Sequence, residues 1–410
     1  MELSLQLEAT LAEVRALPGF EGFLSHPEPE ALFGVADRGP VVVVNVSGWR
    51  CDALLLRPEG VTVQELPTLT AADVADRVRE YLETLGRLAE SAHRLQQARL
   101  RFEAGERSFD ASREVSEARR AYYRVLGEIE SMLTALTEWM WDAIAGPVLS
   151  ALGHGARAEG DTELPRLWWC PTGLLALLPL HAAGRDGDGV LDRVVPSTTP
   201  TLRALVEARK ESTDESGSRL LLVTASDVPD VASLPNVHRE RAFLTDLFAG
   251  QSTLLDAEDA VVERVRAELP RHRWVHFSCH GAQDLLQPSQ GGLLLSDGRL
   301  TIGDISTGYF RGDFAYLSAC QTATGGLVLP DEAITLTAAL HYAGYRHVIG
   351  TLWSVYDEVA AEVTEAVYAD LTSTGVFDPA RSARALHRAT TELRGRRALS
   401  AWVPFIHTGP

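Results

Sequence analysis

Two short apolar segments of this chain each end at a residue that can do chemistry. Segment 274–281 (WVHFSCHG) ends in a His-Gly pair, and segment 314–322 (FAYLSACQT) reaches a cysteine among small residues. Short apolar runs that stop at small residues are typical of buried β-strands. The carboxyl ends of parallel strands meet at one edge of an α/β sheet, so side chains that are distant in the sequence meet there. The pattern predicts a parallel sheet with an imidazole and a thiol at one edge.

His280 and Cys320 are the two reactive side chains at this predicted edge. A cysteine thiol is a weak nucleophile until a neighbouring imidazole takes its proton or stabilises its thiolate. Gly281 has no side chain, so a substrate can approach its backbone closely. Its N–H, together with that of Cys320, would stabilise the oxyanion that forms when the thiolate attacks a carbonyl. These residues predict nucleophilic catalysis by a cysteine and a histidine.

The second half of the chain alternates between strand and helix patterns. After the polar, serine-rich stretch 211–218, apolar runs at 220–223, 252–255 and 274–278 alternate with helical patterns. Such alternation indicates right-handed βαβ units and a parallel sheet. The Asp-Gly pair at 297–298 predicts a tight β-hairpin. We therefore place a domain boundary in the serine-rich stretch.

The first half combines strands with a long helical pattern. Residues 40–66 contain continuous apolar runs of the kind found in buried strands. From Thr70, a favourable helix N-cap, apolar residues recur at steps of three and four, and a second such series ends at Met140. The pattern predicts an antiparallel helical hairpin over about residues 70–155, with arms of roughly 45 Å. We expect its two apolar stripes to bury each other.

The composition excludes several classes of function. The net charge of −18 disfavours nucleic acid as a direct ligand, because phosphate binding needs clustered Lys and Arg. The cysteines at positions 51, 170, 279 and 320 are too scattered for a disulfide framework and lack the spacing of a zinc site. We find no signal peptide, and no apolar stretch approaches the roughly 20 residues of a membrane span. We expect a cytoplasmic protein with reduced thiols, no metal, no organic cofactor and no membrane partner.

Four motifs of the second half, taken in order, resemble the CHAT domain. They are His280-Gly281, 295–301 (LSDGRLT), 317–322 (LSACQT) and 348–357 (VIGTLWSVYD). A weaker likeness covers 39–45 (GPVVVVN), 51–54 (CDAL) and 171–175 (PTGLL) in the first half. The CHAT family groups with caspases and separases as cysteine peptidases of the caspase-haemoglobinase fold.

The resemblance implies a caspase-like α/β fold in two halves, with a mostly parallel sheet flanked by helices. Residues 1–215 would form a degenerate, pseudo-protease half with the helical hairpin inserted, and residues 216–410 would form the catalytic half. The segment that ends at Asp357 is similar to the separase segment whose aspartate receives a basic substrate side chain. Asp357 with Trp353 would then bind substrate. Because Asp is also a favoured helix cap, a capping role for Asp357 is the alternative.

Other cysteines and histidines near the motifs have structural interpretations. Successive strand residues point to opposite faces, so we expect Cys279 to pack in the core. We expect His276 to be a buried, hydrogen-bonded histidine. Cys170 and His181 occur in the reverse order and without the flanking motifs, so we do not expect them to form a catalytic pair.

These features predict a cysteine endopeptidase that cleaves a protein substrate through an acyl-enzyme formed by the Cys320–His280 dyad. The resemblance implies a dedicated substrate encoded nearby, an activating protein partner and a setting in bacterial defence. The alternative is a conditionally inactive, caspase-like interaction module or scaffold in a signalling or defence complex. A small-molecule thiol hydrolase would use the same dyad, but it would need a closed apolar pocket where a protease needs an extended groove.

Overall fold

The computed structural model describes residues 2–17, 32–104, 108–157, 163–185, 187–210, 219–228, 233–284, 287–308, 310–319, 322 and 335–410. The stretch 211–218, in which we place the domain boundary, lies outside these residues. The division at residue 215 therefore stays a prediction.

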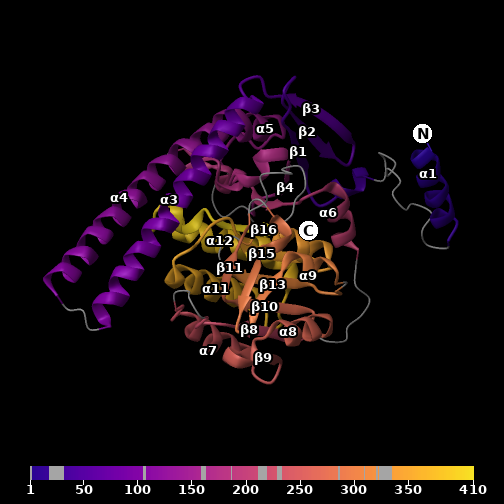
Figure 1. Ribbon diagram of the computed structural model, residues 1–410. Helices are drawn as coiled ribbons and strands as arrows, with labels where there is room; N and C mark the ends of the chain where they lie inside the picture. Colours follow the sequence, from indigo (N-terminus) through magenta and orange to yellow (C-terminus); the bar gives the residue numbers. More distant parts are fainter. Residues whose placement is uncertain are drawn as a thin grey trace.

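Eleven strands of the described chain form one continuous sheet (Figure 1). Most neighbouring strands are parallel; the exceptions are the pairs β3–β2, β2–β1 and β15–β16. The predicted mixed α/β fold with a mostly parallel sheet is confirmed. From edge to edge the strands are β3 (Gly60–Glu65), β2 (Asp52–Arg57), β1 (Val41–Asn45), β4 (Arg166–Pro171), β7 (Val195–Thr198), β16 (Phe405–Thr408), β15 (His347–Thr351), β14 (Phe314–Ser318), β10 (Trp274–Ser278), β8 (Leu220–Thr224) and β9 (Ser252–Asp256).

Two small sheets lie outside the large one. The first contains β11 (His280–Ala282), β12 (Gly292–Leu295) and β13 (Gly298–Thr301). Leu295 pairs with Gly298 across a two-residue turn, which confirms the predicted hairpin. The second sheet pairs β5 (Gly184–Arg185) with β6 (Asp188–Gly189).

Helices cover both faces of the large sheet, and alternate strand residues enter the core on each face. In β8, Leu220 and Leu222 enter the larger core, to which α7, α11 and α12 contribute, whereas Leu221 and Val223 enter the core formed with α8, α9 and α10. The helices are α1 (Glu2–Arg15), α3 (Ala71–Glu103), α4 (Phe109–Met140), α5 (Gly146–Ala151), α6 (Leu202–Arg209), α7 (Val237–Leu247), α8 (Val262–Glu268), α9 (Ile302–Ser306), α10 (Leu336–Tyr342), α11 (Asp357–Leu371), α12 (Ser382–Arg394) and α13 (Leu399–Trp402). No described helix combines the length and apolarity that crossing a bilayer requires.

Helices α3 and α4 form the predicted helical hairpin, which leans along the side of the sheet where α11 and α12 lie (Figure 1). The hydroxyl of Thr70 accepts a hydrogen bond from the N–H of Asp73 at 3.0 Å, as a helix N-cap does. A π-helical turn, Trp141–Ala145, links α4 to α5.

The base of the hairpin is part of the main hydrophobic core. Val78 and Tyr81 of α3, with Leu133 and Met140 of α4, belong to the same cluster of buried side chains as the central strands. The expectation that the two apolar stripes bury each other is therefore wrong for this part of the hairpin. The reason is that the same helix faces also meet the sheet and the segment that follows β15.

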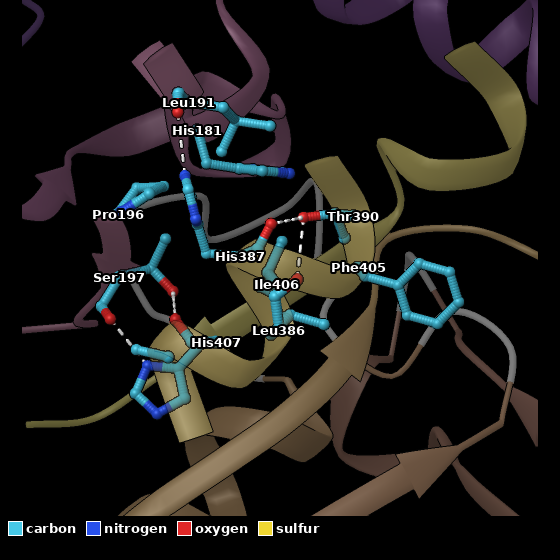
Figure 2. A pocket seen from close by; sticks show the side chains of 12 residues that line it. His181, Leu191, Pro196, Ser197, Leu386, His387, Thr390, Phe405, Ile406 and His407 are labelled. Atoms are coloured by element: carbon cyan, nitrogen blue, oxygen red, sulfur yellow. Dashed lines mark hydrogen bonds between the residues drawn. The ribbon is translucent and has the colours of Figure 1, made fainter. Parts of the chain in front are cut away.

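The two halves of the sheet meet where β7 runs beside β16. Thr198 pairs with Thr408, and the Ser197 hydroxyl lies 2.7 Å from Nδ1 of His407. Nε2 of His407 lies 3.2 Å from Nδ1 of His347 on β15. The adjoining pocket, lined also by His181 and drawn in Figure 2, has a volume of about 20 Å³, room for about one water molecule. The junction is thus a packed, histidine-rich interior.

Acid should destabilise the fold through these buried histidines. Burial lowers the pKa of His181 and of His341 to about 4, and it lowers the pKa of His347 and of His407 well below the usual value. Above about pH 6.5 each imidazole is neutral in both states, so it contributes no pH dependence. Below about pH 6.5 the unfolded chain binds protons that the folded chain cannot, and the free energy of unfolding falls by about 1.4 kcal/mol per pH unit for each histidine.

Urea unfolding at about pH 7.5, 6 and 5 measures this effect. The urea midpoint should fall steeply between about pH 6.5 and pH 5. His181→Gln should reduce by one the number of protons taken up on unfolding, because it removes one buried histidine. The free energy of unfolding should then depend less steeply on pH. A midpoint that stays constant across this range would contradict the prediction.

Candidate active site

The ends of β10 and β14 bring the two sequence motifs together. The strands are parallel neighbours, and Ser278 pairs with Ser318, the last residue of each strand. His280 follows Ser278 by two residues, as Cys320 follows Ser318. The N–H of Cys279 donates to the carbonyl of Ser318 at 3.4 Å. Cys320 itself lies outside the described residues, which reach Ala319 and include Thr322.

The chain on both flanks of Cys320 is held by β15. The hydroxyl of Thr351 donates to the carbonyl of Ala319 at 2.8 Å, and the Thr351 N–H donates to the hydroxyl of Thr322 at 2.9 Å. A Cβ on Gly350 would lie only 2.7 Å from that Thr322 hydroxyl oxygen, so a glycine is needed there. The Gly-Thr pair of the motif at 348–357 thus holds Ala319 and Thr322, the described residues nearest to Cys320 in the sequence on either side. This role of Thr351 was not predicted from the sequence.

His280 begins a new strand, β11, separated from the end of β10 by one residue. It pairs with Leu294, and Gly281 pairs with Leu293, in the small sheet formed by β11 and β12. The change of partner turns the chain away from the large sheet at this point. The His280 side chain is partly buried and lines a large cavity.

The cavity lies between α3 and the segment after β15, and its volume is about 790 Å³. Its walls are mostly apolar and neutral polar side chains, and among the described residues that line it there is no carboxylate, lysine or arginine. They are Leu85, Leu88, Ala89, Ala92, His93, Gln96, Gln97, Leu100, Tyr122, His280, Trp353, Ser354, Val355, Tyr356 and Ser400.

The helical hairpin is attached to the segments that form the other wall. The carboxylate of Glu130 on α4 accepts hydrogen bonds from the backbone N–H groups of Leu399 at 2.9 Å and Ser400 at 3.2 Å, at the start of α13. The hydroxyl of Tyr122 donates to that of Tyr356 at 3.1 Å. These bonds connect the hairpin to the segments that form the other wall of the cavity.

Trp353 lines the cavity although it is only 2% exposed. Its ring packs edge to face against Tyr81 of α3, with ring centroids 5.9 Å apart, and its Nε1–H donates to the Ser400 carbonyl at 3.3 Å. Trp353 therefore also joins the hairpin to the second half of the chain.

Asp357 is the first residue of α11, and it does not act as the helix cap. The residue at the N-cap position is Tyr356, which makes no side-chain cap hydrogen bond. One carboxylate oxygen of Asp357 accepts from both the backbone N–H and the side-chain amide of Asn236, each at 2.8 Å. Asp357 thus ties the start of α11 to the start of α7, and it is not among the described residues that line the cavity.

The structural interpretations of the other cysteines and histidines hold. Cys279 is buried in the core opposite α7, and His276 is fully buried and hydrogen-bonded to Glu240. Burial raises the pKa of the Cys170 thiol to about 12 and lowers the pKa of His181 to about 4. Both shifts oppose the formation of a thiolate and an imidazolium. Within the described part of the chain no group of three or more potential metal ligands occurs.

Comparisons with known proteins give a family match and a match of fold. The family model of the CHAT domain matches residues 134–410. Comparison with curated protein sequences gives no match. The match begins within α4 and covers everything after it. Helix α3, which forms one wall of the cavity, therefore lies outside the family model.

Among solved structures, separase in two separase–securin complexes from Saccharomyces cerevisiae is similar to this chain. One match has a TM-score of 0.59 and 10% identity and covers 93% of this chain and 31% of separase. The other has a TM-score of 0.56 and 11% identity and covers 93% and 30%. The Arg-specific cysteine proteinase gingipain R gives a TM-score of 0.42 at 10% identity over 69% of this chain and 75% of gingipain.

Separase and gingipain are caspase-like cysteine peptidases. At such low identity the likeness to separase shows the fold alone. This chain spans about a third of the separase chain.

Proposed function

Because this chain belongs to the CHAT domain family, we propose that it is a cysteine endopeptidase that uses Cys320 and His280 to cleave a protein substrate. The observation that carries the proposal is the in-register pairing of β10 with β14. The two motifs follow equivalent positions of adjacent parallel strands, where a side chain from each can meet.

The proposed reaction needs only these residues and water. His280 takes the proton of the Cys320 thiol, and the thiolate forms a bond to the carbonyl carbon of the scissile peptide. The N–H groups of Gly281 and Cys320 stabilise the oxyanion. His280 then gives its proton to the leaving amine, which leaves an acyl-enzyme. Water, deprotonated by His280, hydrolyses the thioester and restores the thiol.

The shape of the cavity supports a polypeptide substrate. The lining residues of α3 run from Leu85 to Leu100, which corresponds to roughly 22 Å along the helix. An extended peptide advances about 3.3 Å per residue, so about six or seven residues would lie along this wall. A small-molecule substrate would leave most of this elongated cavity, hereafter the groove, empty. The groove therefore favours an endopeptidase over a small-molecule thiol hydrolase.

Recognition of a substrate arginine or lysine by Asp357, beside Trp353, is part of the proposal. A carboxylate that pairs with a guanidinium makes strong, geometry-dependent hydrogen bonds. The carboxylate would have to give up its bonds to Asn236, or share them, when the substrate binds.

A dedicated protein partner completes the proposed function. The separase structures contain securin, so a chain of this fold is known to bind a protein. In the present chain the hairpin presents many charged side chains to solvent, such as Arg94, Glu90 and Arg113. These charges could pair with charges of an activator or of a docking segment of the substrate. Because α3 forms one wall of the groove, binding there would influence that wall.

Replacing either member of the dyad should abolish cleavage while the fold persists. Cys320→Ala removes the nucleophile and His280→Ala removes the base, so turnover should fall by at least about a thousandfold in each. An irreversible peptide electrophile should label Cys320, as peptide mapping by mass spectrometry would reveal. Cys279→Ala is the matched control, since its thiol is buried in the core, and it should keep both activity and labelling. Labelling at Cys279 or Cys170 in the wild type would contradict the assignment.

A charge in the groove wall should weaken substrate binding. Ala92 lines the cavity on α3, and Ala92→Glu would place a carboxylate where the described wall has none. We expect KM to rise about tenfold with little change in kcat, because Ala92 belongs to the wall of the cavity and not to the dyad. Ala135→Glu, at an exposed alanine of α4 outside the cavity lining, is the control and should change neither constant. Equal kinetics for both variants would show that α3 does not contact the substrate.

Asp357→Ala tests whether Asp357 recognises the substrate or only holds Asn236. If Asp357 receives the substrate cation, wild-type enzyme should cleave fluorogenic peptides ending in Arg faster than those ending in Leu or Asp, and the variant should lose this preference. If the carboxylate acts only on Asn236, the preference should persist and the free energy of unfolding should fall by about 1–2 kcal/mol. Asn236→Ala removes the side-chain partner without removing the charge and should keep the preference. A wild-type preference for Leu or Asp would contradict the basic pocket.

A further inference from the structure

Glu240 is a buried carboxylate for which the proposed chemistry has no role. It lies on α7 between Val237 and Leu244, on the face that packs against the sheet, and it is 2% exposed. A carboxylate withdrawn from water loses favourable solvation unless hydrogen-bond donors replace the water. The identity of its donors therefore indicates what the group does.

Both oxygens of Glu240 accept hydrogen bonds from the ends of the two catalytic strands. The hydroxyl of Ser278, on β10, donates to Oε2. The hydroxyl of Ser318, on β14, donates to Oε1 at 2.8 Å. Thr364 of α11 adds a bond to Oε1 at 3.2 Å. The carboxylate thus bonds to two adjacent strands and connects both of them to helices α7 and α11.

His276, two residues before Ser278 on the same face of β10, also contacts Glu240. Its Nε2 lies 3.3 Å from Oε2 of Glu240, and its Nδ1 lies 3.1 Å from the hydroxyl of Tyr368 on α11. With the proton on Nε2, the ring donates to Glu240 and accepts from Tyr368, so every partner is satisfied. The ring also stacks on Tyr316 of β14, with centroids 5.0 Å apart. The buried network therefore involves both strands twice.

The hydrogen bonds of Glu240 lie where the backbone pairing of the two strands ends. Ser278 and Ser318 are the last paired residues of β10 and β14. His280 and Cys320 each follow by two residues, and two peptide units span at most about 7 Å. A change in the separation or tilt of the two serines would therefore act on the chain just before His280 and just before Cys320.

We propose that Glu240 is a positioning residue that clamps the ends of β10 and β14 through Ser278 and Ser318 and so sets how His280 meets Cys320. The inference rests on the proposed function, because it assigns a role in the chemistry of that dyad. Glu240 contacts neither the substrate nor the reacting atoms in this role.

Glu240→Gln in the full chain tests the clamp. The amide has the same shape and keeps one carbonyl acceptor, so the fold persists, but one strand end loses its charged acceptor. The rate of Cys320 carbamidomethylation by iodoacetamide, followed by mass spectrometry across pH, needs no knowledge of the substrate. We expect the rate at neutral pH to fall roughly 10- to 100-fold. Its pH profile should move towards that of an ordinary thiol, with a midpoint near about 8.5. With a peptide substrate, kcat should fall while KM stays constant.

A second buried carboxylate provides the matched control. Asp192, in the 3₁₀-helix Val190–Asp192, is 8% exposed and accepts from Arg394 at 2.6 and 2.9 Å, away from both catalytic strands. Asp192→Asn should lower stability and leave the reactivity of Cys320 unchanged. Amide hydrogen exchange at residues 278–280 should accelerate in Glu240→Gln and not in Asp192→Asn.

The outcomes separate this inference from the proposed function. If wild-type Cys320 has ordinary thiol reactivity and His280→Ala does not change it, the proposed function fails, and the positioning role fails with it. If His280→Ala slows the wild-type reaction but Glu240→Gln does not, only the positioning role is overturned. Exchange that accelerates without a change in reactivity also overturns it, because Glu240 would then serve stability alone.

Discussion

The parallel pairing of β10 with β14 is the constraint on which the candidate site depends. Strand residues alternate between two cores, so the pairing decides which side chains face α7 and α11 and which face α8 and α10. A slip of one residue would send His276 and Ser278 into the apolar core and bring Cys279 to the polar face. The hydrogen bonds of Glu240 oppose such a slip, because they can form only in the observed register. Thr351 holds the other flank of the same edge from β15.

The cavity beside His280 belongs to both halves of the chain. One wall comes from α3, which precedes the family match, and the other from the segment that follows β15. Glu130, Tyr122 and the Tyr81–Trp353 contact connect these walls with hydrogen bonds and aromatic packing. The attachments run from Tyr81 near the start of α3 to Tyr122 about halfway along α4. The first half of the chain therefore shapes the cavity without supplying either member of the proposed dyad.

The local features of this protein could be predicted from sequence, and the long-range side-chain contacts could not. The Thr70 cap, the helical hairpin, the turn before Gly298 and the strand ends at Ser278 and Ser318 follow from residues close together in the sequence. The burial of Cys279 follows from strand alternation in the same way. The bond from Asn236 to Asp357 and the two contacts of Thr351 join residues that only the folded sheet brings together. Glu240 did leave one signal, a charge on the apolar face between Val237 and Leu244, and only its partners distinguish a clamp from a solvated glutamate.

Strand β16 lies in the middle of the sheet although it contains residues 405–408. It pairs in parallel with β7 and antiparallel with β15, so it is the seam between the strands of the first half and those of the second. During synthesis the sheet can therefore close only after residue 408 has been added, and contacts of such long sequence separation form slowly. Until then two open sheet edges, at β7 and β15, are exposed to pairing with other chains. The joining of the two halves of the sheet therefore waits for β16, which is made after every other described strand of the sheet.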